Sequence, residues 1–196
     1  MILLNGPNTP FGRMALVTAL ELRVPVENRV IAVATAEWLD AANPLRQIPT
    51  LLLDTGDAVF DSRVICSHFA ALAGATGLVP ADIRVQTRWA LVLGLMDAGV
   101  ARQMERMRPD GETSPAAIAA CERRIGKAIA QLEAEADEVC AAFSRIDRIA
   151  AAAALDYIDF RYPHGWRSAA PRLAAWLDAI LERPSMAATR PRPAGG

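Results

Sequence analysis

Several features that define common protein classes are scarce in this sequence. Of its 196 residues, 53% are hydrophobic, but many of these are alanine. No uninterrupted apolar run reaches the roughly 20 residues that a membrane-spanning helix needs. Residues 1–5 are apolar, yet they lack the basic start and the cleavage site of an export signal. The sequence therefore predicts a protein that has no membrane partner.

Residues that hold metals or form disulfides are also few. The chain has 2 histidines and 3 cysteines, Cys66, Cys121 and Cys140. The cysteines form neither a C-x-x-C pair nor a cluster with metal-ligand spacing, so we expect no metal site. An odd, scattered set of cysteines without an export signal is typical of the reducing cytoplasm, which is the predicted location.

An excess of charge of either sign is lacking as well. The 21 basic and 22 acidic residues give a formal net charge of -1. A nucleic-acid-binding domain usually carries a basic patch. We therefore expect no nucleic-acid partner.

The first part of the chain alternates between strand and helix patterns. Strands are predicted over residues 1–5, 26–33, 50–53 and 58–60, and helices over 11–20, 36–41 and 61–73. The last two strands are joined by a hairpin turn at Gly56-Asp57. This order predicts an α/β domain over residues 1–75.

After a Gly/Pro-containing connector over residues 74–80, only helical patterns remain. Apolar residues at helical spacing mark helices around 85–107, 115–132, 146–160 and 173–180. Ser114 followed by Pro115 is typical of an N-cap with proline at the first helical position. We predict an all-helical domain over residues 82–189, followed by a flexible Pro/Gly-rich tail over 190–196.

The first segment with chemical potential is Asn8-Thr9-Pro10-Phe11-Gly12-Arg13, where the first strand leads into the first helix. A helix N-terminus presents unpaired N–H groups and the positive end of the helix dipole. A hydroxyl or amide at that position can donate a hydrogen bond to a thiolate. The alternative is that Thr9 is only the N-cap and Pro10 the first helical residue.

The second segment runs from Asn43 to Leu51 and contains Gln47-Ile48-Pro49 just before a strand. A cis Ile48-Pro49 bond would cost only about 0.5–1 kcal/mol relative to trans. It would turn the backbone N–H and C=O of Ile48 outward, where an extended peptide can pair with them. The alternative is an ordinary trans proline in a surface loop.

The third segment is Asp61-Ser62-Arg63, which opens the helix after the hairpin. Ser62 offers a hydroxyl and a backbone N–H to a carboxylate at the helix N-terminus. The alternative is that Asp61 is a plain N-cap.

The order and spacing of these segments resemble the first domain of glutathione transferases. Thr-Pro-Phe-Gly-Arg near residue 10 is most similar to bacterial members of that family, and Asn-Pro-Leu-Arg-Gln-Ile-Pro and Asp-Ser-Arg-Val-Ile follow in the same order. In the second part, Ser144-Arg145-Ile146-Asp147 resembles the family's helix-capping element. The resemblance extends over roughly residues 1–189 and implies a thioredoxin-like first domain followed by a helical bundle.

The resemblance also implies a ligand and residue roles. Glutathione is the expected co-substrate: Ile48 beside a cis Pro49 pairs with its cysteinyl backbone, and Gln47 reaches its glycyl carboxylate. Asp61 and Ser62 hold the γ-glutamyl end. Thr9, or alternatively Asn8, hydrogen-bonds the sulfur. A homodimer is expected.

The predicted activity is transfer of glutathione to a small hydrophobic electrophile. Lowering a thiol pKa of about 8.5 by about two units needs roughly 2.7 kcal/mol. One hydrogen bond to a charged group supplies about 1.5–3 kcal/mol, and a helix N-terminus adds about 0.3–1. The alternatives are glutathione-dependent disulfide reduction or peroxidase activity, and a non-catalytic glutathione-binding module.

One folding element is predicted in the second domain. Ser144 should cap a helix that begins at Arg145, and Asp147 should reach back to the backbone N–H of Ser144. Because the faces of this helix are apolar nearly all round, we expect it at the centre of the helical bundle.

Overall fold

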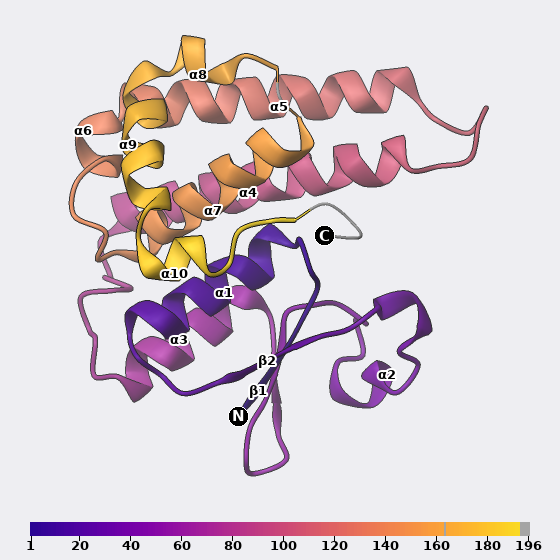
Figure 1. Cartoon of the computed structure of the whole chain (residues 1–196), viewed down its shortest axis with the longest axis vertical. Coiled ribbons are helices and arrows are strands. Elements are labelled where there is room, and N and C mark those ends of the chain that lie inside the picture. The colour runs from indigo at the N-terminus through magenta and orange to yellow at the C-terminus, as the bar shows by residue number, and fades with distance from the viewer. Residues whose placement is uncertain (163, 193–196) are drawn as a thin grey trace.

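The computed structural model describes residues 1–162 and 164–192. The chain forms two parts, a small sheet with helices on its faces and a larger group of helices that packs beside it (Figure 1). The first part contains β1 (Ile2–Asn5), α1 (Pro10–Glu21), β2 (Glu27–Val30), a 3-10 turn η1 (Val33–Thr35), α2 (Leu39–Ala42), β3 (Thr50–Leu52), β4 (Ala58–Val59) and α3 (Ser62–Leu72).

The four strands form one mixed sheet in the order β2-β1-β3-β4. β1 runs parallel to β2 and antiparallel to β3, and β3 runs antiparallel to β4. Neighbouring residues of β1 serve opposite faces of the sheet: Leu3 joins the main core, and Leu4 packs with Leu39 of α2 in a smaller cluster. This is the thioredoxin-like plan that the sequence predicts.

The structure differs from the predicted elements in two places. The second strand was expected over 26–33 but spans Glu27–Val30, and all four of its residues are exposed because it is an edge strand. The helix expected over 36–41 is divided into the turn η1 and the one-turn helix α2. Both short elements lie in the connection between β2 and β3, at the side of the sheet away from α1 (Figure 1).

Within its described residues, the second part contains helices and connecting loops but no strand. The helices are α4 (Ile83–Arg106), α5 (Pro115–Ala134), α6 (Ala136–Val139), α7 (Ile146–Arg161), α8 (Trp166–Ala169), α9 (Pro171–Leu181) and α10 (Pro184–Ala187). α4 and α5 form a long antiparallel hairpin (Figure 1). The predicted N-cap of α5 is present, since the Ser114 hydroxyl accepts a hydrogen bond from the backbone N–H of Ala117 at 3.2 Å.

Helix α7 is the buried centre of the helical part, as predicted. Every residue from Ile146 to Ile158 is buried. α7 contacts both α4 and α1, so it joins the two parts of the chain. Gly99 of α4 allows close approach, because a Cβ there would lie 3.0 Å from Ile158 and 3.2 Å from Tyr157.

The predicted capping box at the start of α7 is wrong. The helix begins at Ile146, its N-cap is Arg145, and no side chain caps it within the part of the chain that the structure describes. Asp147 is fully buried and accepts hydrogen bonds from Arg88 Nη1 at 2.7 Å and from Arg145 Nη2 at 3.2 Å. A guanidinium from α4 competes successfully for this carboxylate because a charge-assisted bond is stronger than one to a neutral N–H.

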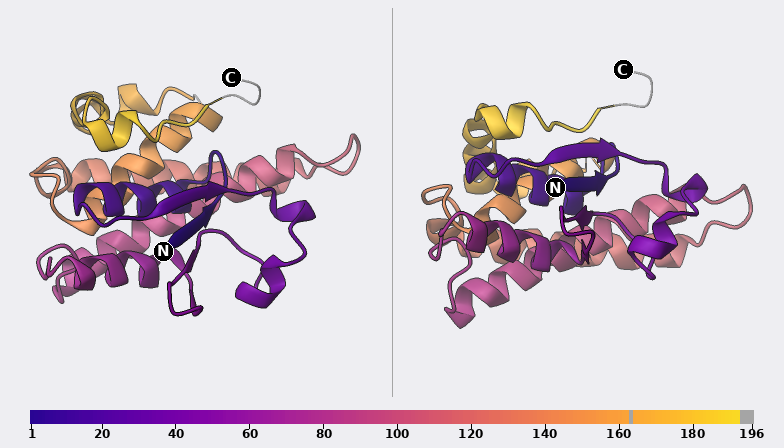
Figure 2. Two further views of the ribbon diagram at one scale, coloured as in Figure 1. Left: turned by 60° about the horizontal axis from the view of Figure 1, so that its bottom comes forward. Right: turned by 90° about the horizontal axis from the view of Figure 1, so that it is seen from below.

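The C-terminal segment runs along α1 (Figures 1 and 2). It is tied to the end of α1 by Arg183, which donates to Glu21 at 2.6 Å, and to the first turn of α1 by Thr189, which accepts from Arg13 Nε at 3.2 Å. Of the tail predicted over 190–196, residues 193–196 lie outside the described residues. No helix in the described chain combines the length and the apolar character needed to cross a bilayer.

Candidate binding cleft

A cleft of about 750 Å³ lies between the sheet part and helix α4. Six of the predicted site residues line it: Thr9, Gln47, Ile48, Pro49, Asp61 and Ser62. They come from the start of α1, the loop before β3 and the start of α3, three segments that are separate in the sequence. The fold therefore brings these residues together around one cavity.

The loop before β3 is shaped by a residue that the sequence reasoning did not select. Asn43 is 1% exposed, and its amide nitrogen donates to the Gln47 carbonyl and to the Thr50 hydroxyl, both at 3.0 Å. Its side-chain oxygen accepts from the backbone N–H of Leu45 at 3.0 Å. In the sequence, the Asn43-Pro44 dipeptide favours a turn, and this feature could have identified Asn43 as a residue that shapes the loop. The Ile48-Pro49 bond is cis, as the resemblance implied.

The start of α3 combines a cap with an open binding position. The Asp61 side chain accepts a hydrogen bond from the backbone N–H of Arg63 at 2.9 Å, so Asp61 is the N-cap of α3. Ser62 follows it, is 5% exposed and lines the cleft. α3 has 11 residues, and its positive end is directed at the cleft, which favours an anionic group there.

Thr9 and Asn8 differ in where their side chains lie. Thr9 is the N-cap of α1, but within the described chain its hydroxyl makes no capping hydrogen bond. Asn8 is absent from the lining of the cleft, and its side chain pairs with the C-terminal segment instead. It donates to the Arg192 carbonyl and accepts from the Arg192 N–H, each at 2.8 Å. Thr9 therefore lines the cleft, whereas the Asn8 side chain is bound to the C-terminal segment.

Helix α4 provides the opposite wall of the cleft. Its lining residues recur at helical spacing: Ala90, Leu93, Gly94, Asp97, Val100 and Met104. Most of this wall is apolar. Burial raises the pKa of the Asp97 carboxyl, and the charge of Arg124 opposes that shift. Sequence periodicity alone could not separate this wall from the helix's core-facing side.

The charged residues of the cleft include both signs. Asp61 and Asp97 carry negative charge, and Arg46 and Arg63 carry positive charge. Such a cavity suits a ligand that bears both an ammonium group and carboxylates. Cys66 lies fully buried on α3, and burial raises the pKa of its thiol to about 12, so it is not a nucleophile at neutral pH.

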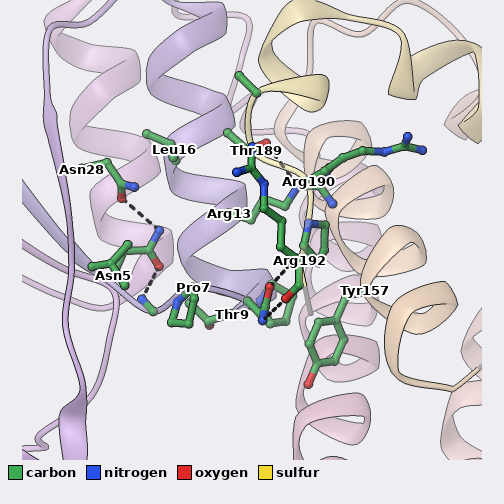
Figure 3. A pocket seen from close by; sticks show the side chains of 16 residues that line it. Asn5, Pro7, Thr9, Arg13, Leu16, Asn28, Tyr157, Thr189, Arg190 and Arg192 are labelled. Carbon is green, nitrogen blue, oxygen red and sulfur yellow. Dashed lines mark hydrogen bonds between the residues drawn. The ribbon is translucent and has the colours of Figure 1, made fainter. Parts of the chain in front are cut away.

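A second cavity of about 580 Å³ borders the cleft at Thr9, which lines both. It lies between the start of α1 and the C-terminal segment (Figure 3). Asn5 lies at its base, where its side chain accepts from the Gly6 N–H at 2.8 Å and donates to Asn28 at 3.2 Å. Within the described residues there is no group of three or more histidine, cysteine or acidic side chains that could hold a metal ion.

Comparison with known proteins supplies relatives of this chain. A sequence model described as "Glutathione S-transferase, N-terminal domain" matches residues 9–72. A glutathione transferase family member from Pseudomonas fluorescens Pf-5, solved with bound glutathione, is 36% identical, with 98% of this chain and 99% of that chain covered and a TM-score of 0.90. A structure of a family member from the same organism, with bound S-(propanoic acid)-glutathione, is 34% identical, with 100% and 99% covered and a TM-score of 0.87.

A further relative comes from Escherichia coli strain K12. It is the GST-like protein YibF, which is described as uncharacterized. It is 29% identical over 156 residues, which cover 76% of this chain and 77% of that protein.

Proposed function

The chain belongs to the glutathione S-transferase family, and we propose that it binds glutathione in the cleft beside α4 and transfers it to an electrophile. The convergence of the three motif segments on one cavity is the observation that carries this proposal. The glutathione held by the Pseudomonas fluorescens relatives supports it.

The cleft matches the chemistry of glutathione group by group. The backbone of Ile48, next to cis Pro49, is available to pair with the cysteinyl unit of an extended peptide. Ser62, at the positive end of α3, receives the γ-glutamyl carboxylate, and Asp61 beside it holds the ammonium group. Gln47, which is exposed, reaches the glycyl carboxylate. Each charged end of the peptide thereby meets a complementary group.

Thr9 activates the thiol in this proposal. Its hydroxyl has no capping partner within the described chain, so it is free to donate to the sulfur. A hydrogen bond to a charged acceptor is worth about 1.5–3 kcal/mol, and one pKa unit corresponds to about 1.36 kcal/mol. The bond therefore lowers the thiol pKa by about one to two units, and the start of α1 adds a smaller contribution of the same sign.

The electrophile approaches the sulfur beside the apolar wall. Phe11 lines the cleft close to Thr9, and Val100 and Met104 face it from α4. This surface suits the apolar body of a small electrophile. The relative that binds S-(propanoic acid)-glutathione supports the idea that the sulfur carries a substituent in this fold. In the reaction the thiolate sulfur bonds to the electrophilic carbon, and the leaving group departs with the electron pair of its bond.

The experiment that tests glutathione binding is titration calorimetry on the full chain and two variants. Ser62→Ala removes a hydroxyl that is buried in the cleft, so binding should weaken by about 1.5–3 kcal/mol, more than about tenfold in Kd. Ser168→Ala removes an exposed hydroxyl from α8 and should leave the Kd unchanged. Equal affinity of all three proteins would refute the assigned site.

A homodimer in the cytoplasm completes the proposal. Several large apolar side chains on the sheet part and on α4 are exposed, among them Val64 at 51% and Ile83 at 75%. Contact with a second copy of the chain would cover such residues. The cytoplasmic location stays a prediction from the cysteine pattern.

A further inference from the structure

The second cavity, which we call the tail cavity, has a lining of one charge sign. Among the described residues, its lining includes three arginines, Arg13, Arg190 and Arg192, and no acidic residue. The other polar side chains there are amides and hydroxyls. This composition differs from that of the neighbouring cleft, which carries both signs.

The three arginines differ in how their charges are balanced. Arg13 is buried and forms an ion pair with Asp156, so its charge is neutralised. Burial lowers the pKa of the Arg13 guanidinium, and the nearby charge of Arg190 lowers it further. Within residues 1–162 and 164–192, neither Arg190 nor Arg192 has an acidic partner. The tail segment therefore carries a surplus of positive charge beside the tail cavity, and the Arg190 side chain extends away from Thr9 (Figure 3).

The main chain at the cavity rim is fixed by specific contacts. The paired hydrogen bonds between Asn8 and the backbone of Arg192, both 2.8 Å, hold the tail beside Thr9 (Figure 3). Thr189 is held from the other side by Arg13. Asn8 is therefore a positioning residue, because it places the arginine-bearing segment next to the residue that faces the sulfur.

From this arrangement we propose that the tail cavity receives the far end of the group that the second substrate places on the sulfur, and that this end carries a carboxylate or a similar anion. The proposal rests on the proposed function, since it takes the glutathione sulfur to lie at Thr9. A substituent on that sulfur can extend from the cleft into the tail cavity, because Thr9 borders both. Its anionic group then meets the positive charge that Arg190 and Arg192 give the tail segment.

Three glutathione derivatives that differ only in one group test this inference by calorimetry on the full chain. They are S-benzylglutathione, S-(carboxybenzyl)glutathione and its neutral counterpart S-(carbamoylbenzyl)glutathione. At low salt we expect the carboxybenzyl derivative to bind about fivefold more tightly than the carbamoylbenzyl one, as for ion pairs at a solvent-exposed rim. This preference should shrink as salt screens the charges.

Charge-removing variants locate the preference. In Arg190→Gln/Arg192→Gln it should disappear, while S-benzylglutathione binds as before. The matched control Arg84→Gln/Arg123→Gln removes two exposed arginines from α4 and α5, outside the tail cavity, and should retain the preference. Asn8→Ala should lose most of the preference, because it releases the tail without removing a charge.

The outcomes separate the two proposals. Equal binding of the carboxybenzyl and carbamoylbenzyl derivatives, or a preference that survives in Arg190→Gln/Arg192→Gln, would overturn the anionic-substrate inference alone. Failure of S-benzylglutathione to bind the unmodified protein would overturn the proposed function, and this inference with it.

Discussion

Replacement of Asp147 by alanine should strongly destabilise the protein. Asp147 is fully buried and accepts hydrogen bonds from Arg88 at 2.7 Å and from Arg145 at 3.2 Å. Within the described residues, its loss leaves the buried Arg88 guanidinium with Glu135, at 2.8 Å, as its one remaining acidic partner. Breaking a buried ion pair costs about 3–5 kcal/mol. Because Glu135 remains, we expect the loss of unfolding free energy to lie at the lower end of this range, at about 3 kcal/mol.

The assay is urea unfolding followed by circular dichroism, together with thermal unfolding. For a chain of this size, about 1 kcal/mol corresponds to about 2–4 °C, so Tm should fall by about 6–12 °C. Ser144→Ala is the matched control. The Ser144 hydroxyl does not cap α7 within the described chain, so its removal should cost less than about 0.5 kcal/mol.

A loss of about 1 kcal/mol in both variants, the usual cost of a lost helix cap, would refute the buried ion pair as the cause. The double variant Arg88→Met/Asp147→Leu provides a second check. It replaces the buried ion pair with apolar groups and should recover much of the stability that Asp147→Ala loses. A double variant no more stable than Asp147→Ala would contradict the ion-pair account.

Two further predictions concern stability against pH and assembly. Burial alone would raise the pKa of the Glu21 carboxyl, but hydrogen bonds from Arg183 and Ser185 and the charge of Arg183 bring it below its ordinary value. The stabilisation that ionised Glu21 gives the folded chain is therefore complete above the unfolded-state pKa, about 4.3. It is lost as the pH falls through the lower folded-state pKa. Glu21→Gln should thus be less stable than the unmodified chain at neutral pH, as measured by urea unfolding. A difference in unfolding free energy between the two proteins that stays constant down to acid pH would argue against this. Light scattering at micromolar concentration should give twice the 21.1 kDa of one chain; a mass of one chain would rule out the homodimer.

The parts of the fold that sequence could predict depend on neighbouring residues. The structure contains three features that depend only on residues a few positions apart. They are the helix start at Pro10, the Ser114-Pro115 cap and the helix start at Asp61-Ser62. The apolar character of α7 on all faces was equally local, and it correctly predicted a buried helix.

The failures involve partners that are far apart in the chain. Ser144 and Asp147 have the spacing of a capping box, yet the carboxylate is bound by Arg88, 59 residues earlier. The side chain of Asn8, the alternative candidate for the sulfur contact, pairs with Arg192, 184 residues later, which the sequence did not predict. No local pattern encodes such contacts, because they depend on how α4, α7 and the tail pack.

The candidate site could be predicted from the sequence only in part. Its motif residues were identified one segment at a time, and the structure places Thr9, Ile48 and Ser62 around a single cleft. The wall from α4 and the role of Asn43 emerge only in three dimensions, since both depend on the orientation of side chains across the fold.

The measurement that tests the central claim most directly is the pKa of the glutathione thiol in the complex. It is followed by the ultraviolet absorption of the thiolate as the pH is raised. Free glutathione should titrate near the ordinary thiol value of about 8.5, and the complex about two units lower. In Thr9→Val, which keeps the shape but lacks the hydroxyl, the pKa should rise by about one to two units, and Thr9→Ser should restore it. A bound thiol that titrates like free glutathione, or a Thr9→Val complex with an unchanged pKa, would contradict the account.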